Sequence, residues 1–357
     1  MQQLRNLWQG TLAVLVMLQA ASGAFAAGRA DALSPRYPYG ATGTFASFVA
    51  ESFRVAGAKS PETASRSFFT YMGDAIPASM DAAKVRLDAI TDLKARADKE
   101  RVLCTSLHKS LKKQIPRFSL DRGFEFSNTV KLGERQCFLQ SVVIASLLQR
   151  AGVAAGVAMV WRNEKGDFCN NGHAVTVARL ADGSDILVDA SDPTPFMTHR
   201  GLMVRVPAQG GYAYVEPVYD NAHRITAYRS LRAGKTVPPP AVALLDEAFL
   251  RSQFTYYRGE RTPGGLFTPP LATAKGLAQS ERRLKQSVSE CPQNPLAVYM
   301  LGKVQERLGE NIPASKSYTR AYSLYSRYGW VPDEEIRALA AIRNKLPPGV
   351  AMAHKNR

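Results

Sequence analysis

The sequence is poor in cysteine, with only four in 357 residues: Cys104, Cys137, Cys169 and Cys291. Four scattered cysteines are not a disulfide framework, and a chain of this length can fold without one. They are separated by 33, 32 and 122 residues, which is not the spacing of zinc ligands. We therefore expect no metal and no cofactor. The sequence does not decide whether Cys104 and Cys169 form a disulfide.

The sequence also lacks a dense basic segment, although it is basic overall. It has 46 Lys and Arg against 30 Asp and Glu, a net charge of +16, and the excess is spread over both halves of the chain. Nucleic-acid binding typically concentrates basic residues in one patch or stripe, so we expect no nucleic-acid partner. A diffuse cationic surface favours anionic partners such as an envelope polymer. The 45% hydrophobic content suffices for two domains with their own cores.

Long apolar runs are absent beyond the N-terminus. Thr11–Ala21 is apolar and is followed by Ala24-Phe25-Ala26, a small-x-small cleavage pattern, which together predict a signal peptide over 1–27. A membrane span needs about 20 apolar residues, and Ser22-Gly23 interrupts the run too early for an anchor. We expect a periplasmic or secreted protein with no transmembrane segment in the mature chain.

The first part of the mature chain predicts an N-terminal extension, partly helical, over 28–80 and a compact domain over 81–237. From Asp81 to Ile115 there is neither Gly nor Pro, and apolar residues recur at helical spacing, which predicts one long helix or two abutting ones that end at Pro116. The looser alternation over 117–132 suits short strands or a loop.

The centre of this domain reads as one helix followed by strands. The run at 137–149 is strongly apolar and ends before Gly152, a natural helix terminator. Asp182-Gly183 between two alternating runs is a strong hairpin signal. The strands that we expect here are Val153–Trp161, His173–Leu180, Asp185–Ala190 and further strand within Tyr212–Tyr228.

Three consecutive prolines at 238–240 mark a boundary. Beyond it we expect a linker and connecting helix over 238–271, a helical region over 272–346 and a flexible C-terminus over 347–357. The helical region has small and large residues at the spacing of a tetratricopeptide repeat, namely Leu301-Gly302, Gly309, Ala314, Tyr318 and Ala321. Such a region packs on the preceding domain or binds a protein partner.

Three residues have the types and the order that thiol chemistry requires. Cys137 begins the apolar helix, His173 begins a strand, and Asp189 lies near the end of the return strand of the hairpin. A free thiol is only about 3% ionised at pH 7, but a helix N-terminus and a nearby imidazolium both stabilise the thiolate. A carboxylate then fixes the imidazole tautomer. The hairpin brings His173 to Asp189 only with a stagger or a bulge.

Three short motifs carry a family resemblance. Gln136-Cys137-Phe138, Gly172-His173-Ala174-Val175 and Val188-Asp189-Ala190-Ser191 together resemble the transglutaminase-like (papain-type) cysteine enzymes. The resemblance implies an α+β fold, with a buried helix packed on an antiparallel sheet, followed by the α-helical repeat-like tail. Val175 stands where the family commonly has an aromatic residue.

The resemblance also implies the roles of the site residues. Cys137 would be the nucleophile, His173 the base and Asp189 the orienting carboxylate, with the backbone N–H of Cys137 as an oxyanion donor and Gln136 beside it. Asp192 is the competing carboxylate, although Ser191-Asp192-Pro193 also suits a turn.

The function expected from these motifs is that of an exported cysteine enzyme. It would attack amide or peptide bonds of a peptide or protein substrate through a Cys-His-Asp triad and a thioester, with hydrolysis favoured over cross-linking. The alternative is a catalytically inactive scaffold whose helical tail binds a protein or envelope partner. The polar loop at 162–172 is the expected wall of the cleft. His108, His199 and His223 have no partner motif, and we assign them no function.

Overall fold

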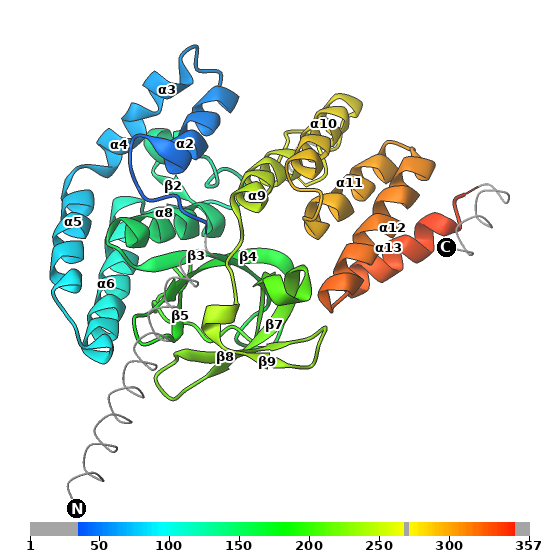
Figure 1. Ribbon diagram of the computed structural model, residues 1–357. Coiled ribbons are helices and arrows are strands. Elements are labelled where there is room, and N and C mark those ends of the chain that lie inside the picture. The colour runs from blue at the N-terminus through cyan, green and yellow to red at the C-terminus, as the bar shows by residue number, and fades with distance from the viewer. Residues whose placement is uncertain (1–34, 268–270, 347–357) are drawn as a thin grey trace, which may run out of the picture.

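The computed structural model describes residues 35–267 and 271–346 (Figure 1). The predicted signal peptide at 1–27 and the predicted flexible C-terminus at 347–357 lie outside the described residues. Within the described part of the chain, no helix combines the length and the apolar character needed to cross a membrane.

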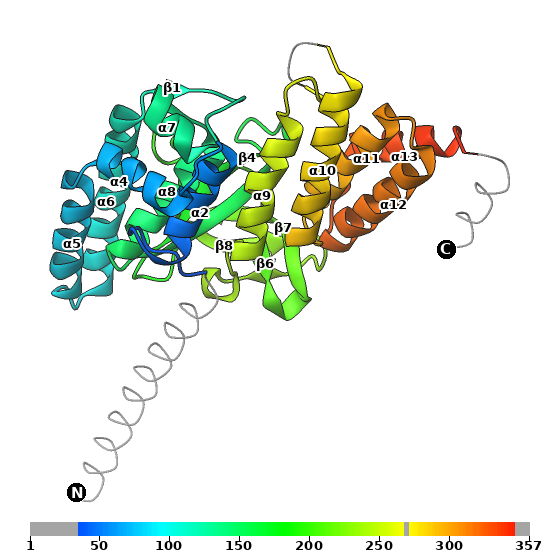
Figure 2. The same cartoon turned by 90° about the horizontal axis from the view of Figure 1, so that it is seen from above.

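The N-terminal helices lie on one side of the molecule (Figures 1 and 2). The predicted helical stretch from Asp81 to Ile115 is two helices, because Asp92 begins a new one by accepting hydrogen bonds from the backbone N–H groups of Lys94 and Ala95. Residues 117–132 contain one short strand and a helix. The helices of this side are α2 (Gly43–Val55), α3 (Pro61–Ala64), α4 (Arg66–Met72), α5 (Ala75–Asp88), α6 (Leu93–Gln114) and α7 (Phe126–Leu132).

The centre of the molecule is an antiparallel sheet of seven strands in the order β5-β4-β3-β6-β7-β8-β9. A further pairing, Asp185 with Ile225, joins β5 to β8. The first six strands in that order therefore form a closed barrel, and β9 extends it beside β8. The strands are β3 (Ala154–Arg162), β4 (Phe168–Arg179), β5 (Asp185–Val188), β6 (Gly201–Val206), β7 (Gly211–Tyr219), β8 (Ile225–Ser230) and β9 (Thr236–Val237).

This closure corrects the fold class expected from the sequence. We predicted a transglutaminase-like or papain-like core, a buried helix packed on an antiparallel sheet, and that prediction was wrong because the sheet closes into a barrel. Each strand was recognisable by its own alternation, but closure depends on the register between β5 and β8, which lie 40 residues apart. No local pattern encodes such a pairing. The chain is a mixed α/β protein built on a six-stranded barrel.

The barrel interior is filled by apolar side chains from all six strands, as the alternation of strand side chains requires. On β4, for example, Val175 and Val177 belong to this interior cluster, whereas Ala174 and Ala178 belong to the cluster outside the barrel. Helix α8 (Cys137–Arg150) packs on that outer side against β3 and β4 (Figure 1). Every residue of α8 from Cys137 to Leu148 is buried, which explains its apolar sequence.

The C-terminal helices extend from the other side of the barrel as a row of neighbours (Figure 2). Gly302 lets two of them approach closely, because a Cβ there would lie 2.8 Å from the ring of Tyr318. The tetratricopeptide-like repeat itself stays a prediction. These helices are α9 (Glu247–Glu260), α10 (Ala274–Glu290), α11 (Pro295–Arg307), α12 (Asn311–Tyr328) and α13 (Asp333–Arg343).

The four cysteines are all free. Cys104 is buried in α6, and Cys169 is half-buried in the first part of β4. The disulfide between them that the sequence left open is not formed.

Candidate active site

Helix α8 begins at the candidate nucleophile. Gln136 is its N-cap, and the side-chain oxygen of Gln136 accepts the N–H of Phe138 at 3.4 Å. This cap satisfies one of the free N–H groups of the first turn and leaves Cys137 as the first helical residue. Both Gln136 and Cys137 are only 2% exposed. The expected substrate-binding role of Gln136 stays a prediction.

Helix α8 is fixed against β4 by two hydroxyl groups. The Ser141 Oγ lies 2.8 Å from the carbonyl oxygen of Cys137 and 3.1 Å from that of Ala174. The hydroxyl of Thr176 donates to the carbonyl oxygen of Ser141 at 3.0 Å. The first turn of the helix is thereby held beside the start of the regular part of β4, where His173 lies.

His173 and Asp189 meet directly, with 2.7 Å between His173 Nε2 and Asp189 Oδ2. In the hairpin, Thr176 pairs with Val188, so Asp189 lies opposite Val175 if the register continues. His173 is two residues before Val175 and therefore on the same face, diagonally across from Asp189. Side chains on such a diagonal are within reach of each other. The expected stagger is therefore supplied by diagonal pairing.

A bulge lies on the other side of His173. Val160 of β3 pairs with His173 and Arg162 pairs with Phe168, so four residues of β4 face a single residue of β3. Two of those four, Asn170 and Asn171, have φ values of 43° and 57°, in the left-handed region that Asn tolerates better than most residues. Much of the polar loop expected at 162–172 is thus this bulged start of β4.

A second histidine shares the carboxylate. His199 Nε2 lies 3.0 Å from the same Oδ2 of Asp189, and the two imidazole rings are 5.4 Å apart between centroids. The other oxygen of Asp189 accepts the N–H of Ser191 at 2.9 Å. His199 is 3% exposed, and its Nδ1 lies 3.2 Å from Glu164 Oε2. Sequence reasoning missed His199, because no motif surrounds it and only the fold of the 189–200 loop brings it here.

These contacts determine the protonation states of the site. Burial works against ionisation of Asp189, but hydrogen bonds from His173 and His199 outweigh it and hold the pKa of Asp189 well below its usual range. Burial likewise disfavours the charged form of His173. Hydrogen-bonding contacts with Asp189 and with the Cys137 thiol nevertheless raise the pKa of His173 well above its usual value. The arrangement therefore favours an imidazolium between a carboxylate and a sulfur.

Asp192, the competing carboxylate, is not part of this group. Its Oδ1 accepts hydrogen bonds from the backbone N–H and the hydroxyl of Thr194, both at 3.0 Å. Its backbone carbonyl oxygen accepts a hydrogen bond from Lys112 at 2.6 Å. Asp192 shapes the turn that returns the chain towards His199, as the Asp-Pro sequence suggested.

Helix α9 covers the cysteine from the C-terminal side. The rings of Phe254 and Tyr257 lie 4.8 and 5.8 Å from that of Phe138, between centroids. Burial first, and then the proximity of the Cys137 sulfur, raise the pKa of Tyr257 well above its usual value. The sequence placed this helix in a connecting segment and gave no sign of this contact.

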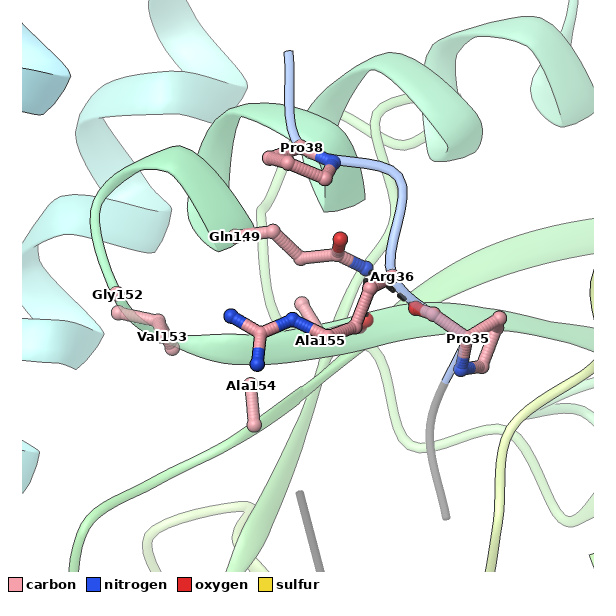
Figure 3. Close-up of a pocket in the computed structure, with 8 residues that line it drawn as sticks. All are labelled: Pro35, Arg36, Pro38, Gln149, Gly152, Val153, Ala154 and Ala155. Atoms are coloured by element: carbon pink, nitrogen blue, oxygen red, sulfur yellow. Dashed lines mark hydrogen bonds between the residues drawn. The ribbon is translucent and has the colours of Figure 1, made fainter. Parts of the chain in front are cut away.

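Two cavities of the structure differ in their distance from the site. The cavity in Figure 3, about 80 Å³, lies at the far end of α8, where Gln149 binds the carbonyl oxygen of Pro35 and the N–H of Tyr37. At 1.5 Å per helical residue, Gln149 is about 18 Å from Cys137, so this cavity is separate from the site. A larger cavity of about 540 Å³ is lined by Glu164, Tyr219 and the two neighbours of His199.

No protein-family model, curated protein or solved structure matches the chain.

Proposed function

We propose that the chain is a cysteine hydrolase that attacks amide or peptide bonds through Cys137, His173 and Asp189. The observation that carries the proposal is the pairing of His173 with Asp189, with 2.7 Å between Nε2 and Oδ2, and the influence of the Cys137 thiol on the same imidazole, whose pKa it helps to raise. The placement of Cys137 at the N-terminus of α8 supports it further, because free backbone N–H groups at the start of a helix can bind the oxyanion of an intermediate.

The two ring nitrogens of His173 have different roles in the proposed hydrolysis. Nε2 of His173 faces Asp189, which leaves Nδ1 to take the thiol proton. The thiolate then attacks the substrate carbonyl carbon, and the imidazolium returns its proton to the departing amine, which leaves a thioester on Cys137. In the second half, His173 takes a proton from water, the hydroxide attacks the thioester, and the thiol and the carboxylic acid are released.

The proposal includes a peptide or protein substrate, hydrolysis in preference to cross-linking, and a periplasmic or secreted location. An anionic envelope polymer and a protein partner for 272–346 remain candidate partners. One observation favours the alternative of an inactive scaffold: Cys137 is 2% exposed and covered by α9. A substrate must reach it from the side of His173, whose side chain is 22% exposed.

The test is alkylation of Cys137 by iodoacetamide at pH 6, located by peptide mass, in the wild type and in His173→Ala. We expect the variant to react about 100-fold more slowly, because the proton acceptor is lost. Cys169, half-buried on the same strand, shows that the reagent reaches the protein, and its labelling should change much less than that of Cys137, because burial influences the pKa of Cys169 more than the charge of His173 does. Equal rates for Cys137 in both proteins, or no labelling of Cys137 while Cys169 reacts, would establish the scaffold instead.

A further inference from the structure

We propose that His173, Asp189 and His199 form a binding site for a divalent transition metal of the Zn²⁺ class, and that the bound ion switches off Cys137. The binding itself stands on the geometry of three side chains. Only the switching rests on the proposed function.

The three donor atoms already converge. One ring nitrogen of each histidine and one carboxylate oxygen of Asp189 lie within 4.8 Å of one another. In a tetrahedral site with bonds of about 2.1 Å, the donor atoms are about 3.4 Å apart. The two N–O distances are 2.7 and 3.0 Å, so each must lengthen by about half an ångström, and the two histidine nitrogens, which lie within 4.8 Å of each other, must approach to a similar distance. The loop at 189–200 carries two of the three ligands, Asp189 and His199.

The outer partners of the three side chains are also those of a metal site. A ligating histidine commonly gives its other ring N–H to a carboxylate, which fixes the tautomer and the ring orientation. His199 Nδ1 lies 3.2 Å from Glu164 Oε2, at ion-pair distance but without the geometry of a hydrogen bond. The free oxygen of Asp189 is held by the N–H of Ser191. Two of the three donors thus have a second polar neighbour.

The donor set selects the kind of metal. Two imidazole nitrogens and one carboxylate oxygen suit zinc, iron, nickel and copper, whereas magnesium and calcium prefer oxygen ligands. Asp189 and His199 are each 3% exposed, so the site offers little room for the water that magnesium retains. The partly exposed edge of His173 provides the entrance and a fourth position for water.

Metal binding would remove the base from the triad. Bound to the ion through Nε2, the neutral ring of His173 carries its proton on Nδ1, and that nitrogen then has no lone pair for the proton of Cys137. The same ion takes the Oδ2 of Asp189 that otherwise orients the imidazole. One ion therefore blocks both partners of the cysteine without contacting the sulfur.

The test is titration of the purified, metal-free protein with ZnCl₂ by isothermal calorimetry at neutral pH. We expect one ion per chain. His199→Ala should weaken the affinity by more than about 100-fold, and Glu164→Gln, a milder change, by about 10- to 100-fold. His223→Ala, which alters an exposed histidine, and Cys137→Ser should both leave it unchanged. Absence of zinc binding in the wild type, or unchanged binding in His199→Ala and Glu164→Gln, would overturn the proposal, as would loss of binding in Cys137→Ser.

The switching is scored separately by alkylation of Cys137. Zinc just sufficient to saturate the wild type should slow its labelling and have no effect in His199→Ala, whereas Glu164→Gln should need about 10- to 100-fold more zinc for the same slowing. A protein that binds zinc as described but whose Cys137 labels equally fast in wild type and His173→Ala would refute the cysteine hydrolase and leave the metal site standing. Zinc that binds at these residues without slowing Cys137 would refute the switch.

Discussion

The hydroxyl of Tyr325, near the end of α12, donates a hydrogen bond to Asn170 Oδ1 at 2.9 Å. Asn170 lies in the bulge of β4 that precedes His173, and both it and Asn171 adopt positive φ values. Such a backbone costs free energy and persists only where its surroundings hold it. The helical tail therefore contacts the strand that carries the candidate base.

Tyr325→Phe should loosen this bulge. We expect a loss of about 1 kcal/mol in the free energy of unfolding, the usual contribution of one hydrogen bond, together with slower alkylation of Cys137. Tyr328→Phe is the matched control, because its hydroxyl binds the carbonyl oxygen of Gln293 at 3.0 Å, away from β4. It should cost similar stability and leave Cys137 unaffected. Identical labelling in both variants would show that α12 does not influence the site.

Two substitutions of Asn171 distinguish the cost of the positive φ in the bulge from the loss of the side-chain hydrogen bond. Asn171 is 1% exposed, and its amide donates to the hydroxyl of Tyr214 at 2.8 Å. Both Asn171→Ala and Asn171→Gly lose that hydrogen bond, but glycine adopts a φ of 57° without the clash of a Cβ atom. We expect the alanine variant to be about 1 kcal/mol less stable than the glycine variant in urea denaturation. A glycine variant that is no more stable than alanine would argue against strain at this position.

Part of this structure could be predicted from local sequence patterns, and the features that were not predicted have a common cause. The apolar run that begins at Cys137 is a buried helix, and Asp182-Gly183 joins β4 to β5 as predicted, because each pattern lies within about twenty residues. The closed barrel was missed, and so was the second histidine. Both depend on contacts between distant segments: Asp185 with Ile225, and His199 with Glu164. Such contacts form only after the strands have packed.

A buried ion pair secures the closure of the barrel. Asp185, which is fully buried, binds Arg179 through both oxygens at 2.9 and 3.0 Å and accepts the hydroxyl of Tyr228 at 2.6 Å. Arg179 is on β4 and Tyr228 on β8, so the carboxylate joins the two strands on either side of β5.

Asp185→Asn should destabilise the barrel severely. The substitution removes the negative charge that the buried guanidinium of Arg179 contacts at 2.9 and 3.0 Å, and removing one partner of a buried ion pair typically costs about 3–5 kcal/mol. Glu216→Gln is the control within the same barrel: it breaks ion pairs with Arg229, which is 61% exposed, and with Arg162, which is 32% exposed and 3.8 Å away, and it should cost at most about 1 kcal/mol. Chemical denaturation of both variants measures the difference. Comparable losses would mean that Asp185 is not what holds β5 to β8.

Glu335 gives the C-terminal helices a dependence on pH. It lies on α13 with no exposed surface, and its two carboxyl oxygens make no hydrogen bond within the described residues. Burial raises the pKa of Glu335 to about 8, against the smaller opposing attraction of Lys303. The folded protein thus holds this proton up to about pH 8, whereas the unfolded chain releases it above its ordinary value of 4.5.

Between those two pH values the folded state binds more protons than the unfolded state, so stability falls as the pH rises, by up to about 1.4 kcal/mol per pH unit. Glu335→Gln cannot ionise and should remove this slope: we expect it to match the wild type near pH 5 and to exceed its stability at pH 8. Urea denaturation at several pH values measures both slopes. Glu334→Gln, at the exposed neighbouring position, should retain the wild-type slope. Parallel curves for wild type and Glu335→Gln would mean that the carboxyl ionises in the folded protein as readily as in the unfolded chain.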